Sequence, residues 1–60
     1  MEKHRVADGR VPIDEEVMTG IQNPDGTFRN VQSLTFWKNL WWGPGKHSYV
    51  YYTPTHWWRE

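Results

Sequence analysis

The chain has 60 residues, no cysteine and a formal net charge of zero, with seven Lys and Arg against seven Asp and Glu. This length limits it to one domain, and the absence of thiols excludes disulfide bonds and thiolate metal sites. A single core of this size supplies only about 3–5 kcal/mol of stability, so we expect the chain to gain stability from a partner.

No apolar run approaches the ~20 residues that a membrane-spanning helix needs. The first ten residues, MEKHRVADGR, have no apolar stretch behind their charges, unlike a signal peptide. We therefore expect a soluble, unprocessed protein in the cytoplasm, a location that also suits a chain without cysteine.

Residues 1–12 are polar, contain Gly9 and Pro12 and show no periodic pattern. Such a segment predicts an extended or flexible arm that orders on a partner. Residues 13–60 are then expected to form the single small domain.

The next segment, PIDEEVMTG, carries signals for two structures. Pro12, the acids that follow it and Gly20 are typical of a short helix. Val17, Thr19 and Ile21 instead alternate as in a strand. We expect a short helix or turn that leads into a strand near Ile21.

The sequence NPDG at residues 23–26 gives the clearest local signal. Pro24 presets the first central position of a turn, and Gly26 adopts a positive φ without steric cost. This pattern predicts a β-hairpin that joins residues 17–22 to residues 27–32.

Residues 33–42 fit either a helix or a strand. Ser33 suits a helix N-cap and Gly43 a helix end, whereas the aromatic composition favours a strand that Lys38 and Asn39 interrupt. The strand is marginally favoured.

The remaining residues indicate a turn, a strand and a tail. GPGK is expected to turn, HSYVYYT at residues 47–53 to form a third antiparallel strand, and THWWRE to form a short tail held by its own rings. The predicted fold is therefore mainly β, a small α+β domain being the alternative, with one possible short helix.

Five Trp, three Tyr and two Phe give ten aromatic rings, which is more than a core of this size is expected to hide. Trp41 and Trp42 are adjacent, as are Trp57 and Trp58, and neighbours in a strand point to opposite faces. We expect some of these rings to face outward, unless the arm and the tail cover both sides of a small sheet.

Charge is distributed unevenly, because residues 27–59 contain no Asp or Glu and hold all ten rings. The aromatic half is therefore weakly cationic and the other half acidic. Trp, Tyr and Arg are enriched in protein interfaces. We expect a non-enzymatic accessory or regulatory protein that docks on a larger protein, or on a second copy, through its rings. The expected anchors are Trp37, Trp41, Trp42, Tyr49, Tyr51, Tyr52, Trp57 and Trp58, with Arg29, Lys38, Lys46 and Arg59 steering an acidic partner.

Three other ligands fit the same rings. Single-stranded nucleic acid stacks its bases on exposed aromatic rings while cations follow the phosphates. Carbohydrate is a second alternative, because Trp41 and Trp42 before a Gly-Pro turn resemble the Trp pair of small chitin-binding modules. A membrane surface is a third, since Trp and Tyr favour the water–lipid interface.

No catalytic or metal site is expected. His4, His47 and His56 have no zinc-site spacing, and Ser48 is too close in sequence to His47 to serve as its nucleophile. The acids Asp14, Glu15 and Glu16 are expected to be solvated. We expect no cofactor, no metal and no enzyme activity.

Overall fold

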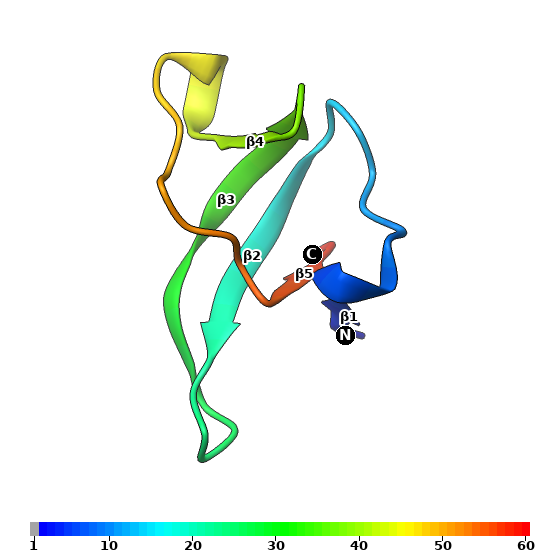
Figure 1. The fold of residues 1–60 in the computed structure, drawn as a ribbon, viewed down its shortest axis with the longest axis vertical. Helices are drawn as coiled ribbons and strands as arrows, with labels where there is room; N and C mark the ends of the chain where they lie inside the picture. The colour runs from blue at the N-terminus through cyan, green and yellow to red at the C-terminus, as the bar shows by residue number, and fades with distance from the viewer. Residues whose placement is uncertain (1) are drawn as a thin grey trace.

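The computed structural model describes residues 2–60 and confirms the mainly β class (Figure 1). The elements in chain order are β1 (His4–Arg5), the 3₁₀ turn η1 (Val6–Asp8), β2 (Glu16–Gln22), β3 (Phe28–Trp37), β4 (Leu40–Trp42), the 3₁₀ turn η2 (Pro44–Lys46) and β5 (His56–Trp58). The strands form one sheet in the order β1-β5-β2-β3-β4, and every strand pairs antiparallel with its neighbours. Within residues 2–60, the helical structure consists of the two 3₁₀ turns.

The predicted hairpin at residues 23–26 is confirmed and joins β2 to β3. Gly26 has φ 93° and donates its backbone N–H to Asn23 O at 3.0 Å. Asp25 Oδ1 accepts the backbone N–H of Thr27 at 3.0 Å, and Asn23 N donates to Thr27 O at 2.7 Å. The turn residues therefore close the loop with their own polar groups, as Asn and Asp commonly do.

A bulge in β3 changes which face Phe28 occupies. Between paired positions, β2 advances from Thr19 to Ile21 while β3 advances from Arg29 to Gln32, so β3 contains one extra residue. Asn30, with φ 54°, lies inside this step. Simple alternation would place Phe28 and Leu34 on the same face of the sheet. Because β3 contains one extra residue between them, Phe28 lies on the face opposite Leu34.

β5 lies between β1 and β2, so the C-terminal segment is not the tail that the sequence suggested. Trp57 faces His4 of β1 on one side and Thr19 of β2 on the other. The Thr55 hydroxyl accepts the backbone N–H of Gln22 at 2.8 Å and lies 3.3 Å from Gly20 O, so it tethers the start of β5 to β2.

The third strand was predicted at the wrong place, because residues 47–53 form only a single bridge, between Tyr49 and Trp42. After η2 the chain runs along the outer edge of β4, where Gly43 N donates to Ser48 O and Val50 N donates to Trp41 O. It then leaves this edge towards Pro54 and β5. Residues 47–53 have the composition of a strand, but the strand beside them, β4, is only three residues long and cannot pair with the whole segment.

Of the short helix or turn expected before a strand near Ile21, the helix is wrong: a bend at residues 13–14 leads into β2, which begins at Glu16. Alternation wins over the helix signals because it buries Val17 and Thr19 on one face. Gly20, expected to end the helix, lies in β2, where an added Cβ would come within 3.1 Å of the Phe28 ring and 3.3 Å of the Trp58 ring. Its missing side chain lets both rings pack onto the strand.

The strand preference for residues 33–42 is confirmed. β3 continues to Trp37, a two-residue turn at Lys38 and Asn39 reverses the chain, and β4 follows. Both turn residues have positive φ, 50° and 63°, as a type I′ hairpin turn requires.

The division into a flexible arm of residues 1–12 and a domain of residues 13–60 stays a prediction. The structure pairs His4 and Arg5 with β5 and bonds Val6 N to Thr55 O at 2.9 Å. Both ends of the described chain therefore lie on the β1–β5 side of the sheet (Figure 1).

One face of the sheet, called the core face, carries the hydrophobic core. Its buried members are Val17, Leu34, Trp41 and Trp57, with Val6, Val11, Phe36 and Val50 packed against them. Thr19 is fully buried beside them and satisfies its hydroxyl by donating to Gln32 O at 2.8 Å. Two indoles thus replace the aliphatic residues that the sequence lacks.

We expect Leu34→Ala to destabilise the fold by about 2–5 kcal/mol, because removing a buried Leu side chain leaves a cavity. Leu34 is 1% exposed, and the whole domain is expected to have only about 3–5 kcal/mol of stability. Thermal unfolding followed by circular dichroism should therefore show a largely unfolded variant.

The matched control is Leu40→Ala, the same substitution at a position that is 38% exposed. Its melting curve should remain close to that of the unmodified chain. Equal melting temperatures for the two variants would contradict the assignment of Leu34 to the core.

Candidate functional site

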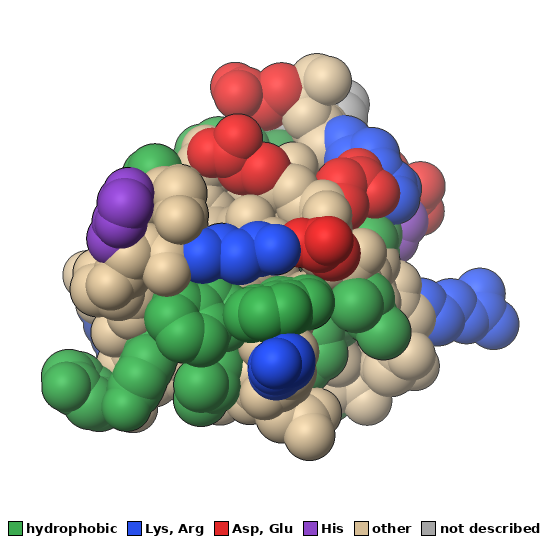
Figure 2. Space-filling model, turned by 90° about the horizontal axis from the view of Figure 1, so that it is seen from above, with side chains coloured by type: hydrophobic (Ala, Val, Ile, Leu, Met, Phe, Trp, Pro, Cys, Tyr) green, Lys and Arg blue, Asp and Glu red, His purple; other side chains and the backbone are tan. Residues whose placement is uncertain are grey.

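The exposed rings gather at the β4 end of the sheet, on the face opposite the core. Four side chains form a continuous row, called here the aromatic ladder: Trp37, Trp42, Tyr49 and Tyr51. Successive ring centroids are 6.1, 5.3 and 5.4 Å apart, and successive planes are inclined by 60°, 78° and 72°. Figure 2 shows apolar side chains gathered in a band at this end, with Lys and Arg beside them.

Strand register explains why these rings come together. Trp42 pairs with Thr35 across β3 and with Tyr49 on its other side, and residues that face one another across antiparallel strands share a face. Trp37 lies two residues beyond Thr35 and so on the same face. The Trp42 indole N–H donates to Trp37 O at 2.9 Å, which fixes its ring.

Exposure increases along the ladder. Trp37 and Trp42 are half-buried, Tyr49 is 38% exposed, and Tyr51 is 94% exposed. Exposed single hydrophobic residues are common, but a ring this free at the end of an ordered row offers a large apolar contact surface.

A groove of about 310 Å³ lies beside the ladder, between β4 and the segment that follows η2. Its lining residues are Asn39, Leu40, Trp41, Tyr49, Val50, Tyr51, Tyr52 and Thr53. Leu40 was not among the expected site residues, although a Leu one residue before a Trp pair was a usable signal.

Two lysines flank the ladder. The ammonium groups of Lys38 and Lys46 lie 4.5 and 4.3 Å from the Trp37 ring centroid, within the range of cation–π interactions. Lys46 also forms an ion pair with Asp14. Lys38 has no acidic partner within residues 2–60, so it is the cation of the ladder that remains free.

Three of the expected anchors are core residues. Trp41 and Trp57 are 4% exposed and Trp58 is 6% exposed, so none of them presents its ring at the surface. Neighbouring indoles do lie on opposite faces, as expected: Trp57 joins the core face, while Trp58 packs against Phe28 on the other. For Trp57 and Trp58 the alternative of a sheet covered on both sides applies, since both rings are buried and residues 4–5 of the expected arm pair with β5.

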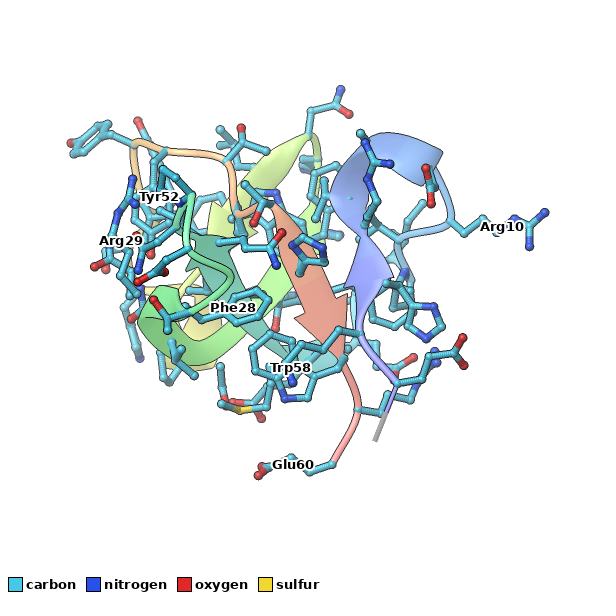
Figure 3. The ribbon with its side chains drawn as sticks, turned by 90° about the horizontal axis from the view of Figure 1, so that it is seen from below. Arg10, Phe28, Arg29, Tyr52, Trp58 and Glu60 are labelled. Atoms are coloured by element: carbon cyan, nitrogen blue, oxygen red, sulfur yellow. The ribbon has the colours of Figure 1, made fainter. Side chains whose placement is uncertain are left out.

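Lys3 and Phe28 provide the cover over Trp58. The Trp58 and Phe28 ring centroids are 5.7 Å apart, and Lys3 Nζ lies 4.9 Å from the Trp58 ring. Figure 3 shows Phe28 beside Trp58 at the side of β5. Lys3 was missed because its role depends on the pairing of β1, which the sequence does not indicate.

The other expected site residues lie away from the ladder or are engaged. Arg29 bonds the Asn23 side chain beside the hairpin turn. The Tyr52 hydroxyl accepts a hydrogen bond from Gln32 Nε2. Arg59 forms a bidentate pair with Glu15, at 2.6 and 3.1 Å, and lies over the Trp57 ring.

Two histidines outside the ladder contact neighbouring side chains. The His4 ring stacks on Trp57 at 4.4 Å, and His56 Nδ1 lies 2.9 Å from the Thr55 hydroxyl. An open groove of about 600 Å³ passes His56, but its other lining residues carry no carboxylate. Within residues 2–60, no three His, Asp or Glu side chains are close enough together to hold a metal ion.

Comparison with known proteins gives no relative. The chain matches no protein-family model, and neither a curated protein nor a solved structure is significantly similar to it. Residues 2–60 also contain no helix with the length and hydropathy needed to cross a bilayer.

Fluorescence quenching separates the two groups of indoles. We expect acrylamide to quench part of the emission of the folded chain, because Trp37 and Trp42 are half-buried whereas Trp41, Trp57 and Trp58 are buried. In the double variant Trp37→Phe and Trp42→Phe, the remaining emission should resist the quencher. Residual emission quenched as readily as that of free tryptophan would contradict the burial of the other three.

The ion pair of Arg59 with Glu15 is expected to appear in a carboxylate titration. The hydrogen bonds that the Arg59 guanidinium donates to the Glu15 carboxylate lower the pKa of Glu15, because they favour its ionised form. A lowered folded-state pKa means that the pair stabilises the fold above the ordinary Glu pKa and that this stabilisation is lost as the pH falls through the lowered value.

NMR titration of the Glu15 side chain should therefore give a midpoint below the usual Glu range, and Arg59→Gln should return it to that range. Arg29→Gln, which leaves the pair intact, serves as the control. An unchanged midpoint in the Arg59 variant would mean that Arg59 is free for a partner, as the sequence had suggested.

Proposed function

We propose that this protein is a non-enzymatic accessory or regulatory protein that docks on a larger protein through the aromatic ladder. The observation that supports the proposal is the ordered row of four rings that ends in Tyr51, which is 94% exposed. Tyr and Trp are the residues most enriched in the anchors of protein interfaces.

The ladder is suited to docking because its rings are held before the partner arrives. The Trp42 ring is held by its indole bond to Trp37 O, and a backbone bridge places Tyr49 beside Trp42, where the two rings are in edge-to-face contact. Ordering a side chain in an interface costs about 0.5–1.5 kcal/mol, so rings that are already ordered lose less on binding. The partner also stabilises this small chain, because it binds the folded form.

Single-stranded nucleic acid is the alternative, and the cations support it less well. Of the four basic residues expected to steer an anion, Lys46 is paired with Asp14 and Arg59 with Glu15. The lysine ammonium groups over Trp37 also compete with a base for that ring. Carbohydrate and membrane-surface binding remain compatible with the rings, but no contact favours either one.

The experiment is photo-crosslinking in the source cells with a photoreactive leucine at position 40, which lines the groove. The intact ladder should give a discrete crosslinked protein. Tyr51→Ser should reduce its yield at least tenfold, because the loss of an anchor ring costs about 2 kcal/mol or more.

The matched control is Ile13→Ser, which removes another large hydrophobic side chain, 71% exposed, outside the ladder. It should leave the crosslink unchanged. Equal losses in the two variants would contradict docking through the ladder. Crosslinking to nucleic acid instead, together with binding to single-stranded DNA that weakens steeply with salt, would support the alternative.

A further inference from the structure

We infer that the groove at the start of β5 binds a small organic molecule that carries a phosphate monoester. This inference goes beyond the proposed docking function, because the groove lies on the β1–β5 side of the sheet and the aromatic ladder lies at β4, the opposite edge. Three observations lead to it: an arginine without an ion-pair partner opposite a histidine, a lining without carboxylates, and exposed apolar residues beside them.

The groove has the size of a small-molecule site and walls fixed by hydrogen bonds. Its volume is about 600 Å³, and its lining comes from residues 5–7, Gln22 and residues 53–56. Small-molecule sites commonly measure about 300–1,000 Å³. Val6 N donates to Thr55 O at 2.9 Å, and Gln22 N donates to the Thr55 hydroxyl at 2.8 Å. These bonds hold the three segments of the lining together.

Strand register places Arg5 and His56 on the same face of the sheet. They are partners across β1 and β5, and such directly opposite residues have Cβ atoms about 4.5–5.5 Å apart. Arg5 forms no ion pair within residues 2–60. Since like charges in a cross-strand pair repel, an anion that lies between Arg5 and a protonated His56 stabilises both.

The His56 ring is already oriented for a ligand. Its Nδ1 lies 2.9 Å from the Thr55 hydroxyl, and the ring is in edge-to-face contact with Phe28, with centroids 5.2 Å apart. These contacts leave Nε2 for a ligand, and both ring nitrogens donate when the imidazole is protonated.

The surroundings of this pair are also positive. Lys3, two residues before Arg5, has its ammonium group 5.4 Å from the centroid of the Phe28 ring, which itself contacts His56. Asp8 lines an adjacent pocket with Arg5 but forms no ion pair with it within residues 2–60. The charge at the groove therefore favours an anion.

A phosphate monoester fits the lining better than a carboxylate does. No carboxylate lines the groove, and Figure 3 shows Glu60 beyond the other end of β5. Besides Arg5 and His56, the lining offers the side-chain amide of Gln22 and the hydroxyl of Thr53 as donors. A phosphate monoester has three terminal oxygens and a charge of about −1.5 to −2 at neutral pH, whereas a carboxylate has a single charge. The phosphate therefore offsets both cations and accepts from more of these donors.

The apolar part of the lining indicates an organic ester rather than free phosphate. Val6 and Ala7 of η1 line the groove beside Arg5, and both keep part of their surface exposed. An apolar group joined to the phosphate covers these side chains and gains affinity by removing their surface from water.

The test is an NMR titration of the ¹⁵N-labelled chain with phenyl phosphate at constant ionic strength. The backbone amides of Val6, Thr55 and His56 should shift, while the indole N–H resonances of Trp37 and Trp42 should not. Inorganic phosphate should bind more weakly because it lacks the apolar group. Benzoate should bind more weakly because it keeps the ring but carries a carboxylate. If either of them binds as tightly as phenyl phosphate, the assigned ligand class is wrong.

Arg5→Gln should weaken the binding of phenyl phosphate about tenfold or more, because it removes charge-assisted hydrogen bonds. Arg5 is exposed on a two-residue edge strand, and unchanged amide resonances of Val17 and Leu34 will verify that the variant is folded. The matched control is Lys38→Gln, which removes a positive charge without an acidic partner at the ladder and should leave the affinity unchanged.

Equal affinities of the two variants, or shifts confined to Trp37 and Trp42, would overturn this inference. The Tyr51-dependent crosslink would survive either result, so the docking function is tested separately.

Discussion

The structure depends on the pairing of β5 between β1 and β2. The three residues of β5, His56–Trp58, connect the N-terminal segment to the central hairpin. They also place the Trp57 and Trp58 side chains on opposite faces of the sheet. Trp57 completes the core with Val17 and Leu34, while Trp58 packs on the other face with Phe28. Burying two indoles in this way removes roughly 300–500 Å² from water, which is large for a chain without disulfides.

The ends of the chain hold this arrangement in place. Lys3 lies over Trp58, and Arg59 lies over Trp57 while it bonds Glu15. Packing rather than hydrogen bonding positions Trp57, since its indole N–H is buried without a partner among residues 2–60. The charged residues that the sequence offered for a partner are in this way used largely for intramolecular contacts, and the surface left for a partner is the aromatic ladder.

Local signals in the sequence predicted much of the fold and little of the site. The NPDG turn and the alternation around Val17 were sufficient for the central hairpin, because both act over a few residues. β5 was missed because a strand of three residues has no recognisable period, and the bulge at Asn30 because no Gly marks it. Exposure of the rings was not predictable either, since it depends on pairing between distant segments. The sequence analysis therefore grouped exposed and buried rings together as docking anchors. The buried members of that group are Trp41, Trp57 and Trp58.

The ladder is a consequence of this division of the rings, because indoles used in the core are not available for docking.

The most direct test of the arrangement is amide hydrogen exchange at His56, Trp57 and Trp58, measured by NMR on the intact chain. If β5 is an interior strand, these amides should exchange about as slowly as those of Val17 and Thr19 in β2. Exchange at the rate of an unstructured peptide would show that the C-terminal segment is a free tail, and the account of both the core and the ladder would be wrong.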